Sequence, residues 1–243
     1  MKKLIIICFT FMLVVTGGCS MNENQNGKED KKTEAVKPID MDPKDLPKVP
    51  AFQDEKTREY MTSTKEVEPG YYLLESKMKG FTMLFPEDAK ISRLTYNDGE
   101  FYETIEFDSY EEKTNIQLNG EVTYYRKKSF VENKETLLDT ISEQNGYKGN
   151  FEKSSEKGKE IYFASMKDIF KDIKRKYNFS YSYIGFIKST NEKYLGVEYN
   201  FTFGCLKDDQ PCSLNEKETR KKAKKMINSI TFNIKKKEQK DDK

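Results

Sequence analysis

Aromatic residues are distributed unevenly along this chain, and their distribution limits the folds that it can adopt. The chain has 243 residues, and 27 of its 31 Phe and Tyr residues lie at or after Tyr71. Many of them alternate with polar residues, which is the pattern of a strand with one buried face, and aromatic side chains are enriched in strands. We therefore expect a strand-rich globular domain over residues 71–234, followed by a charged tail over 235–243.

Turn residues and apolar spacing divide this domain into strands and two helices. One helix is expected at 132–145, where Gly146 would end it, and one at 216–228, where Asn215 would cap the first turn. Residues 168–174 fit either a single helical turn or a bulged strand. The predicted strands are 71–76, 81–85, 101–109, 116–126, 158–166, 176–188, 194–203 and 229–234. The expected fold class is α+β, a single domain in which two or more helices flank an antiparallel β-sheet.

Two short segments resemble the PsbP-like α/β/α domains. The sequence Gly80-Phe81-Thr82-Met83-Leu84-Phe85-Pro86-Glu87 is similar to the first strand of that family, with its pattern of Gly, Phe, a hydrophobic run and Pro. The stretch 223–232 is similar to the last helix of the family running into its last strand. The resemblance implies an antiparallel sheet with helices on its faces, and binding or assembly work in place of catalysis. It transfers no ligand site, because no matching site residue is identifiable.

The N-terminus predicts where the protein is located. Two lysines precede an apolar run of twelve residues over 4–15, which is too short to cross a bilayer and fits the hydrophobic region of a signal peptide. The following Thr16-Gly17-Gly18-Cys19 resembles the lipobox of bacterial lipoproteins, although its Thr replaces the usual Leu. The resemblance implies that residues 1–18 are removed and that Cys19 carries the lipid. The alternative is an ordinary secreted protein cut near Gly18.

Lipidation of Cys19 would place the mature chain on the extracellular face of the cell membrane, and the Lys- and Asn-rich composition favours a Gram-positive bacterium. Two or three acyl chains on one Cys suffice for stable anchoring. Lys2 and Lys3 account for the whole net charge of +2, so the mature chain is neutral. A nucleic-acid partner is disfavoured, because such proteins keep a basic excess on the folded domain. The expected partners are the membrane, through the lipid anchor, and an unknown envelope protein or polymer.

The segment 19–70 is predicted to be a mostly disordered tether that carries the lipidated Cys. It holds five of the seven prolines, and its only aromatic residues are Phe52 and Tyr60. Such a composition buries too little apolar surface to offset the entropy of ordering. Residues 51–64 could still form one short helix packed on the domain.

The composition excludes several catalytic and metal-binding chemistries. The chain has no His, which excludes a Ser-His-Asp triad, a Cys-His pair and His-ligated zinc. Cys205 and Cys212 lie seven positions apart around a Pro-containing loop, so outside the cytoplasm we predict a disulfide. Their spacing does not match the redox motif Cys-x-x-Cys. We predict no cofactor, no metal site and no catalytic residue.

Two surfaces remain as candidates for binding, each with a structural alternative. The cations Arg220, Lys221, Lys222, Lys224 and Lys225 could meet an anionic partner, or form the solvated face of an amphipathic helix. The aromatic residues Tyr177, Phe179, Tyr181, Tyr183 and Phe186 could stack on a ligand, or form one face of a sheet. The predicted function is a non-catalytic binding or assembly module of the cell envelope. The alternative is a His-independent hydrolase that acts on envelope polymers through a Ser-Lys pair or two carboxylates.

Overall fold

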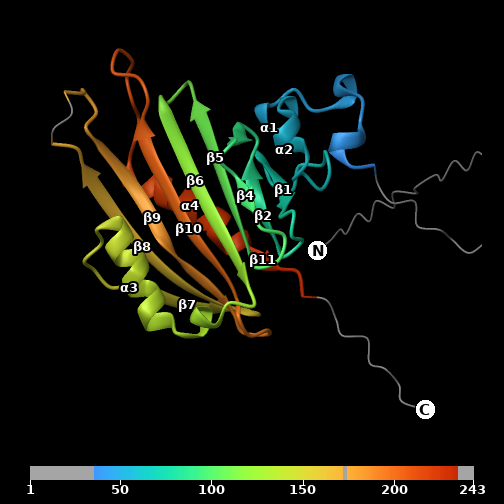
Figure 1. Ribbon diagram of the computed structural model, residues 1–243. Coiled ribbons are helices and arrows are strands. Elements are labelled where there is room, and N and C mark those ends of the chain that lie inside the picture. Colours follow the sequence, from blue (N-terminus) through green and yellow to red (C-terminus); the bar gives the residue numbers. More distant parts are fainter. Residues whose placement is uncertain (1–35, 172–173, 235–243) are drawn as a thin grey trace, which may run out of the picture. The chain divides into compact units, whose positions relative to one another are not determined.

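The computed structural model of this protein describes residues 36–171 and 174–234 (Figure 1). The predicted signal peptide, Cys19 and the charged tail lie outside these residues. The described strands are β1 Tyr71–Glu75, β2 Phe81–Pro86, β3 Ala89–Ile91, β4 Tyr96–Asn97, β5 Tyr102–Glu111, β6 Ile116–Arg126, β7 Glu152–Glu156, β8 Lys159–Ile169, β9 Phe179–Ser189, β10 Leu195–Cys205 and β11 Thr231–Phe232. The α-helices in the same residues are α1 Pro50–Gln53, α2 Glu55–Arg58, α3 Lys134–Asn145 and α4 Glu216–Ser229. None of these helices has the length and apolar character needed to cross a membrane.

The strands form two antiparallel sheets. The large sheet has the order β3-β5-β6-β10-β9-β8-β7, and β4 pairs with the N-terminal part of β5. The small sheet has the order β1-β2-β11. Helices α3 and α4 lie on opposite faces of the large sheet (Figure 1). The predicted α+β class, with an antiparallel sheet flanked by helices, is therefore confirmed. The longest strands pair without interruption, and β6 pairs with β10 along its whole length from Ile116 to Arg126.

The main core lies between the large sheet, the small sheet and α4. The buried residues of α4 are Thr219, Ala223, Met226 and Ile227, which recur every three or four positions as predicted. The side chain of Asn215 caps the helix by accepting a hydrogen bond from the Glu218 amide at 3.0 Å, which confirms the predicted start. The helix ends at Ser229, one residue later than predicted. As a result the last strand shrinks to Thr231–Phe232.

A smaller core lies under α3 on the opposite face. Its buried residues are Val131, Leu137, Ile141, Ala164, Ile184 and Phe186. Asn133 caps the helix through the Thr136 amide, and Gly146 ends it in the left-handed conformation with φ 64°. The predicted stop at Gly146 is confirmed, since a residue without Cβ adopts that conformation at no steric cost.

The prediction of a tether that extends to residue 70 is wrong over the described residues from 38 onward. Leu46, Ala51 and Phe52 are buried in the main core, and the Phe52 ring packs edge-on against Tyr72 with centroids 4.7 Å apart. Prolines that suggested disorder begin short helices, because proline fits the first helical turn. The few apolar residues of this segment do not build a core of their own. Each one fills a place on the surface of the β-sheet domain.

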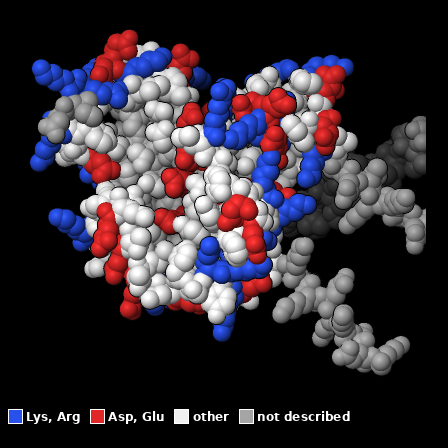
Figure 2. Space-filling view, viewed as in Figure 1, with Lys and Arg blue, Asp and Glu red and all other residues white. Residues whose placement is uncertain are grey.

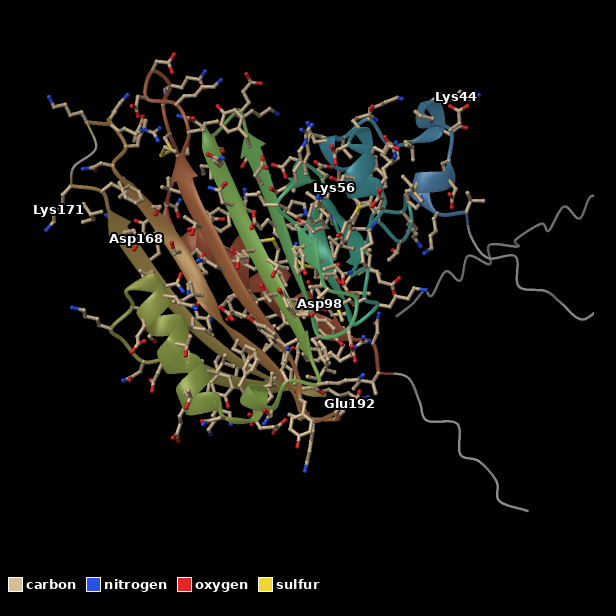
Figure 3. The ribbon with its side chains drawn as sticks, in the orientation of Figure 1. Lys44, Lys56, Asp98, Asp168, Lys171 and Glu192 are labelled. Atoms are coloured by element: carbon tan, nitrogen blue, oxygen red, sulfur yellow. A yellow bond between two sulfur atoms is a disulfide. The ribbon has the colours of Figure 1, made fainter. Side chains whose placement is uncertain are left out.

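Side-chain hydrogen bonds hold this N-terminal segment to the domain. Thr57 is fully buried, and its hydroxyl accepts a hydrogen bond from the Ile91 amide at 2.9 Å. Lys56 reaches the Ser92 carbonyl oxygen at 2.8 Å (Figure 3). Both contacts join α2 to the end of β3. The short helix that the sequence allowed at 51–64 is therefore present as two single-turn helices, broken at Asp54, which caps the second one.

Smaller differences from the predicted elements also have physical causes. The edge strands β3, β4 and β7 are missing from the prediction because they are short or, in β7, exposed at every position. The segment 168–174 begins as strand, since β8 continues to Ile169 by pairing with Phe179. A pattern of burial cannot identify a strand that buries nothing.

Candidate functional site

Acidic partners neutralise most of the basic run on α4. Four of its five cations form ion pairs with carboxylates of other elements. The pairs are Arg220–Glu152 at 2.6 Å, Lys222–Glu111 at 2.9 Å, Lys224–Glu152 at 3.4 Å and Lys225–Glu68 at 2.7 Å. Of these five cations, Lys221 alone has no ion-pair partner among the described residues. Acidic and basic side chains are likewise intermixed over the face drawn in Figure 2. Three carboxylates thus face five cations, so the run anchors the helix to the sheets and keeps an excess of two positive charges.

The aromatic residues around β9 do not form one stacking platform. Tyr183 is fully buried, and its hydroxyl lies 2.7 Å from Thr219 Oγ1 under α4. Phe186 is buried on the opposite face, under α3, because odd and even positions of a strand point to different faces. Tyr177 lies before the strand and donates a hydrogen bond to the Gln210 carbonyl oxygen. The sheet-face interpretation is right for Phe179, Tyr181 and Tyr183, whereas a platform of all five residues is wrong.

The predicted disulfide between Cys205 and Cys212 is present. It closes the loop that joins β10 to α4. Asn115, which is buried in the turn before β6, holds this loop from inside: its amide donates to the Lys207 carbonyl oxygen at 2.7 Å, and its side-chain oxygen accepts from the Lys207 amide at 2.9 Å. The disulfide and Asn115 therefore act as a structural clamp on the loop that precedes α4.

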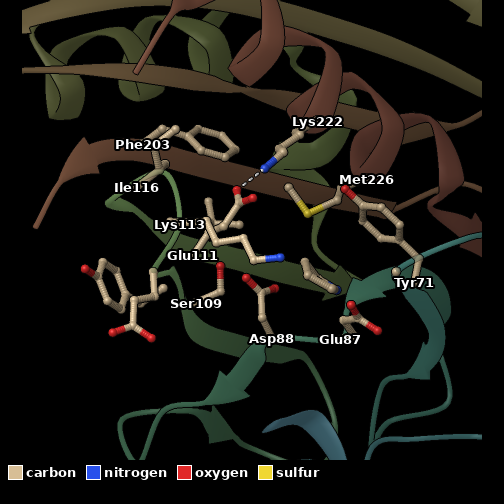
Figure 4. Close-up of a pocket in the computed structure, with 15 residues that line it drawn as sticks. Tyr71, Glu87, Asp88, Ser109, Glu111, Lys113, Ile116, Phe203, Lys222 and Met226 are labelled. Carbon is tan, nitrogen blue, oxygen red and sulfur yellow. Dashed lines mark hydrogen bonds and ion pairs between the residues drawn. The ribbon is translucent and has the colours of Figure 1, made fainter. Parts of the chain in front are cut away.

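A cleft of about 480 Å³ lies beside α4 (Figure 4). It lies between α4, the ends of β1 and β2, and the turn that joins β5 to β6. Its lining residues are Gly70, Tyr71, Pro86, Glu87, Asp88, Ser109, Tyr110, Glu111, Glu112, Lys113, Ile116, Leu118, Phe203, Lys222 and Met226. These segments are far apart in the sequence, and the docking of α4 brings them together. We call this cavity the α4 cleft.

The α4 cleft has an apolar floor and a charged rim. Leu118, Phe203 and Met226 belong to the main core and form the floor. On the rim, the hydrogen bond from Lys222 holds the pKa of Glu111 below its usual value, and it joins α4 to the end of β5. This ion pair fixes one wall of the cleft.

The opposite wall carries a carboxylate in a different electrostatic setting. Burial raises the pKa of Asp88, and the nearby charge of Lys222 opposes only part of this effect. Burial also raises the pKa of Tyr71 to about 12, and the charge of Asp88 adds to it. Lys113 extends into the cleft from the β5–β6 turn, and Ser109 points toward Asp88 (Figure 4). The cleft thus presents an acid, an amine and a hydroxyl around an apolar floor.

Comparison with known proteins shows the family of this chain. A family model described as "Putative lipoprotein YvcA" matches residues 47–231. The chain is also 62% identical over 240 residues to "Putative lipoprotein YvcA" of Bacillus subtilis (strain 168), a match that covers 98% of this chain and all of that protein. This chain belongs to the YvcA lipoprotein family. No solved structure matches it.

The YvcA family match also bears on the predicted boundaries. The match begins at residue 47, well before the predicted domain start at Tyr71, and it includes the buried Ala51 and Phe52. The description of the YvcA relative supports the lipoprotein interpretation that was based on Cys19. The likeness to PsbP-like domains stays a prediction.

Most residues of the cleft in this YvcA-family chain could not be predicted from the sequence. Lys222 was predicted only as one member of a basic run, and the adjacent acids Glu111 and Glu112 have the pattern of a solvated turn. Asp88 and Lys113 carry no local signal at all, because neither belongs to a motif. Only the buried setting of Asp88, beside a residue of α4, distinguishes it from other surface acids. Among the described residues, no three acidic or Cys side chains are placed to hold a metal ion.

Proposed function

We propose that this protein is a lipid-anchored, non-catalytic binding module of the cell envelope that holds a small ligand in the α4 cleft. Family membership and the lipobox-like sequence before Cys19 support the anchor. The mature chain would lie on the extracellular face of the membrane, held by acyl chains on that cysteine. The partner can be a free small molecule or the exposed group of an envelope polymer.

The observation that carries the proposal is the combination of floor and rim in the α4 cleft. Its volume of about 480 Å³ lies within the range of small-molecule sites, which are mostly apolar with a few convergent polar groups. The apolar floor supplies contact area, while Asp88, Ser109 and Lys113 supply groups that can orient a ligand. An ion pair between Glu111 and Lys222 keeps one wall in place before any ligand arrives. A preformed cleft of this kind loses little conformational entropy on binding.

The competing function is a hydrolase that works without His. Ser109 would be its nucleophile, since it lines the same cleft as Asp88 and Lys113. A hydrolase would release a product from an envelope substrate, whereas a binding module would return its ligand unchanged. The two functions are therefore separated by the fate of the bound molecule.

The test uses the full-length lipidated protein, incubated with a small-molecule fraction of its own cell envelope. We expect native mass spectrometry to detect a ligand on the wild type that is lost in the double variant Asp88→Arg, Lys113→Glu. The matched control is Lys221→Glu, which reverses a charge on the exposed side of α4 and should keep the ligand. Absence of any ligand on the wild type would contradict the proposal. Turnover that Ser109→Ala abolishes would replace binding by hydrolysis.

The lipid anchor is tested in bacterial cells that express the protein. We expect Cys19→Ala to abolish labelling by a radioactive or clickable fatty acid and to release the protein from the membrane fraction. Retention of this variant in the membrane with an unchanged mass would contradict lipid attachment at that residue. It would leave the ligand test unaffected.

A further inference from the structure

Two opposite charges of the α4 cleft lack an ion-pair partner. Among the described residues, neither Asp88 nor Lys113 forms an ion pair, although Glu111 and Lys222 in the same cleft pair with each other at 2.9 Å. Both unpaired side chains point into the cleft (Figure 4). Asp88 is partly removed from water, so its charge is less well solvated than that of a surface acid.

The two charges argue against a ligand of one sign. A simple anion would meet Glu87, Asp88 and Glu112 on the rim, and a simple cation would meet the ammonium groups of Lys113 and Lys222. A ligand that carries an ammonium and a carboxylate close together would pair with both free groups. Charge-assisted hydrogen bonds of this kind are roughly twice as strong as neutral ones.

The floor of the cleft selects for the rest of the ligand. Phe203 and Met226 are core residues that line the bottom of the cavity, and the half-buried Ile116 and Tyr71 extend this apolar surface toward solvent. An apolar side chain that leaves water for this floor gains about 25 cal/mol for each Å² that is buried. A zwitterionic head without an apolar body would leave the half-buried side chains of Ile116 and Tyr71 in contact with water.

We infer that the α4 cleft binds a compact zwitterion of the amino-acid type with an apolar side chain. The ammonium group lies against Asp88, the carboxylate group against Lys113, and the side chain on the floor at Phe203 and Met226. The Ser109 hydroxyl, which faces Asp88, can accept one further hydrogen bond. This inference rests on the proposed function, because it names the ligand class of the same cleft.

The test uses isothermal titration calorimetry with the full-length protein to compare three probes that share the leucine side chain and differ in their charged groups. L-leucine carries both charges, leucinamide keeps only the ammonium group, and N-acetylleucine keeps only the carboxylate. We expect leucine to bind most tightly. Asp88→Asn should weaken leucine and leucinamide by about tenfold and leave N-acetylleucine unaffected. Lys113→Met should weaken leucine and N-acetylleucine by about threefold, since its ammonium is exposed to solvent.

Matched controls separate these effects from general changes of charge. Asp108→Asn removes an exposed acid from the opposite face of β5, and Lys221→Met removes an exposed cation of α4. Neither variant should change the affinity for any probe by more than twofold. Thermal unfolding of all four variants checks that each is folded at the temperature of the titration.

The outcomes distinguish this inference from the proposed function. Equal binding of leucine and leucinamide, or no effect of Lys113→Met, would contradict a zwitterionic ligand. It would leave the proposal of a binding cleft intact. The inference would also fail if none of the three probes bound while an envelope ligand still depended on Asp88 and Lys113. If neither the probes nor the envelope fraction bound, both proposals would fail together.

Discussion

The two faces of the large sheet are stabilised in different ways. The face toward α4 is closed by the small sheet, the N-terminal segment and a helix with four buried residues. The face toward α3 has a small core at one end, and the strands beyond it carry Thr, Asn and Glu side chains. The face toward α4 therefore holds most of the buried side chains, and the face toward α3 holds few.

Two carboxylates that bond to α4 and one carboxylate on the other face have opposite pKa shifts. Hydrogen bonds from Lys222 and Arg220 hold the pKa values of Glu111 and Glu152 below their usual range where these acids contact α4. On the other face, burial raises the pKa of Glu198, and the charge of Glu121 adds to it. Glu111 and Glu152 therefore favour the folded state at neutral pH, while Glu198 and the buried Asp88 of the α4 cleft oppose it.

The largest expected effect comes from truncating one buried isoleucine in each of the two cores. Ile227 of α4 and Ile141 of α3 are both 1% exposed, so truncation removes the same group from each core. We expect Ile227→Ala to lower the free energy of unfolding by about 4 kcal/mol and Ile141→Ala by about 2 kcal/mol. The reason is that α4 packs against strands of both sheets, which limits its collapse into the cavity, whereas α3 packs on one sheet and can shift.

Urea denaturation of both isoleucine variants measures these values directly. Equal losses would mean that the two cores are equally rigid. A larger loss at Ile141 would reverse the assignment of the structural face. In either case, the different sizes of the two cores would not determine how much stability is lost.

The second expected effect concerns the clamp at the start of α4. Replacing Cys205 and Cys212 by Ser should lower the free energy of unfolding by about 2 kcal/mol, because the disulfide closes a short loop in the unfolded chain. Asn115 should keep the loop in place, so the folded structure should persist. Unfolding curves of the variant, with the reduced wild type as control, measure the loss. Two freely alkylated thiols in native, oxidised protein would contradict the disulfide itself.

The smallest expected effect on stability comes from neutralising one carboxylate on each face of the large sheet. Glu152 has a depressed pKa, so its contribution is present above the unfolded value near 4.5 and is lost as the pH falls through the lower folded value. Glu198 has a raised pKa, so the folded state takes up its proton first, and its unfavourable contribution is relieved as the pH falls from 7 toward 4.5. At pH 7, Glu152→Gln should therefore destabilise the protein and Glu198→Gln should stabilise it. Each change should be below about 1 kcal/mol.

The measurement is the free energy of unfolding of each Glu variant at pH 7 and at pH 4. The difference from wild type should shrink at the lower pH for both, since the glutamates there approach the neutral state of Gln. The two variants should differ in sign at pH 7. The same sign for both would show that burial, and not the partner cations, dominates on each face.

Local patterns predicted much of the fold, because strand alternation, helical periodicity and capping residues can be recognised within each element. The β6 strand was predicted with its observed bounds, and α4 with its cap at Asn215, because periodicity and capping residues are local signals. The segment around Phe52 was missed because its apolar residues are too sparse to form a periodic pattern. Their burial depends on a surface that other parts of the chain provide.

The candidate site divides in the same way between local and tertiary signals. The sequence by itself determined the absence of His chemistry, the pairing of Cys205 with Cys212 and the lipobox-like Cys19, since each depends on residue type and short spacing. Only the tertiary structure decided that Lys222 pairs with Glu111 and that Asp88 and Lys113 face one cleft. The physical reason is that electrostatic pairing and cavity shape depend on distances in space. In this protein those distances are set when α4 docks between the two sheets.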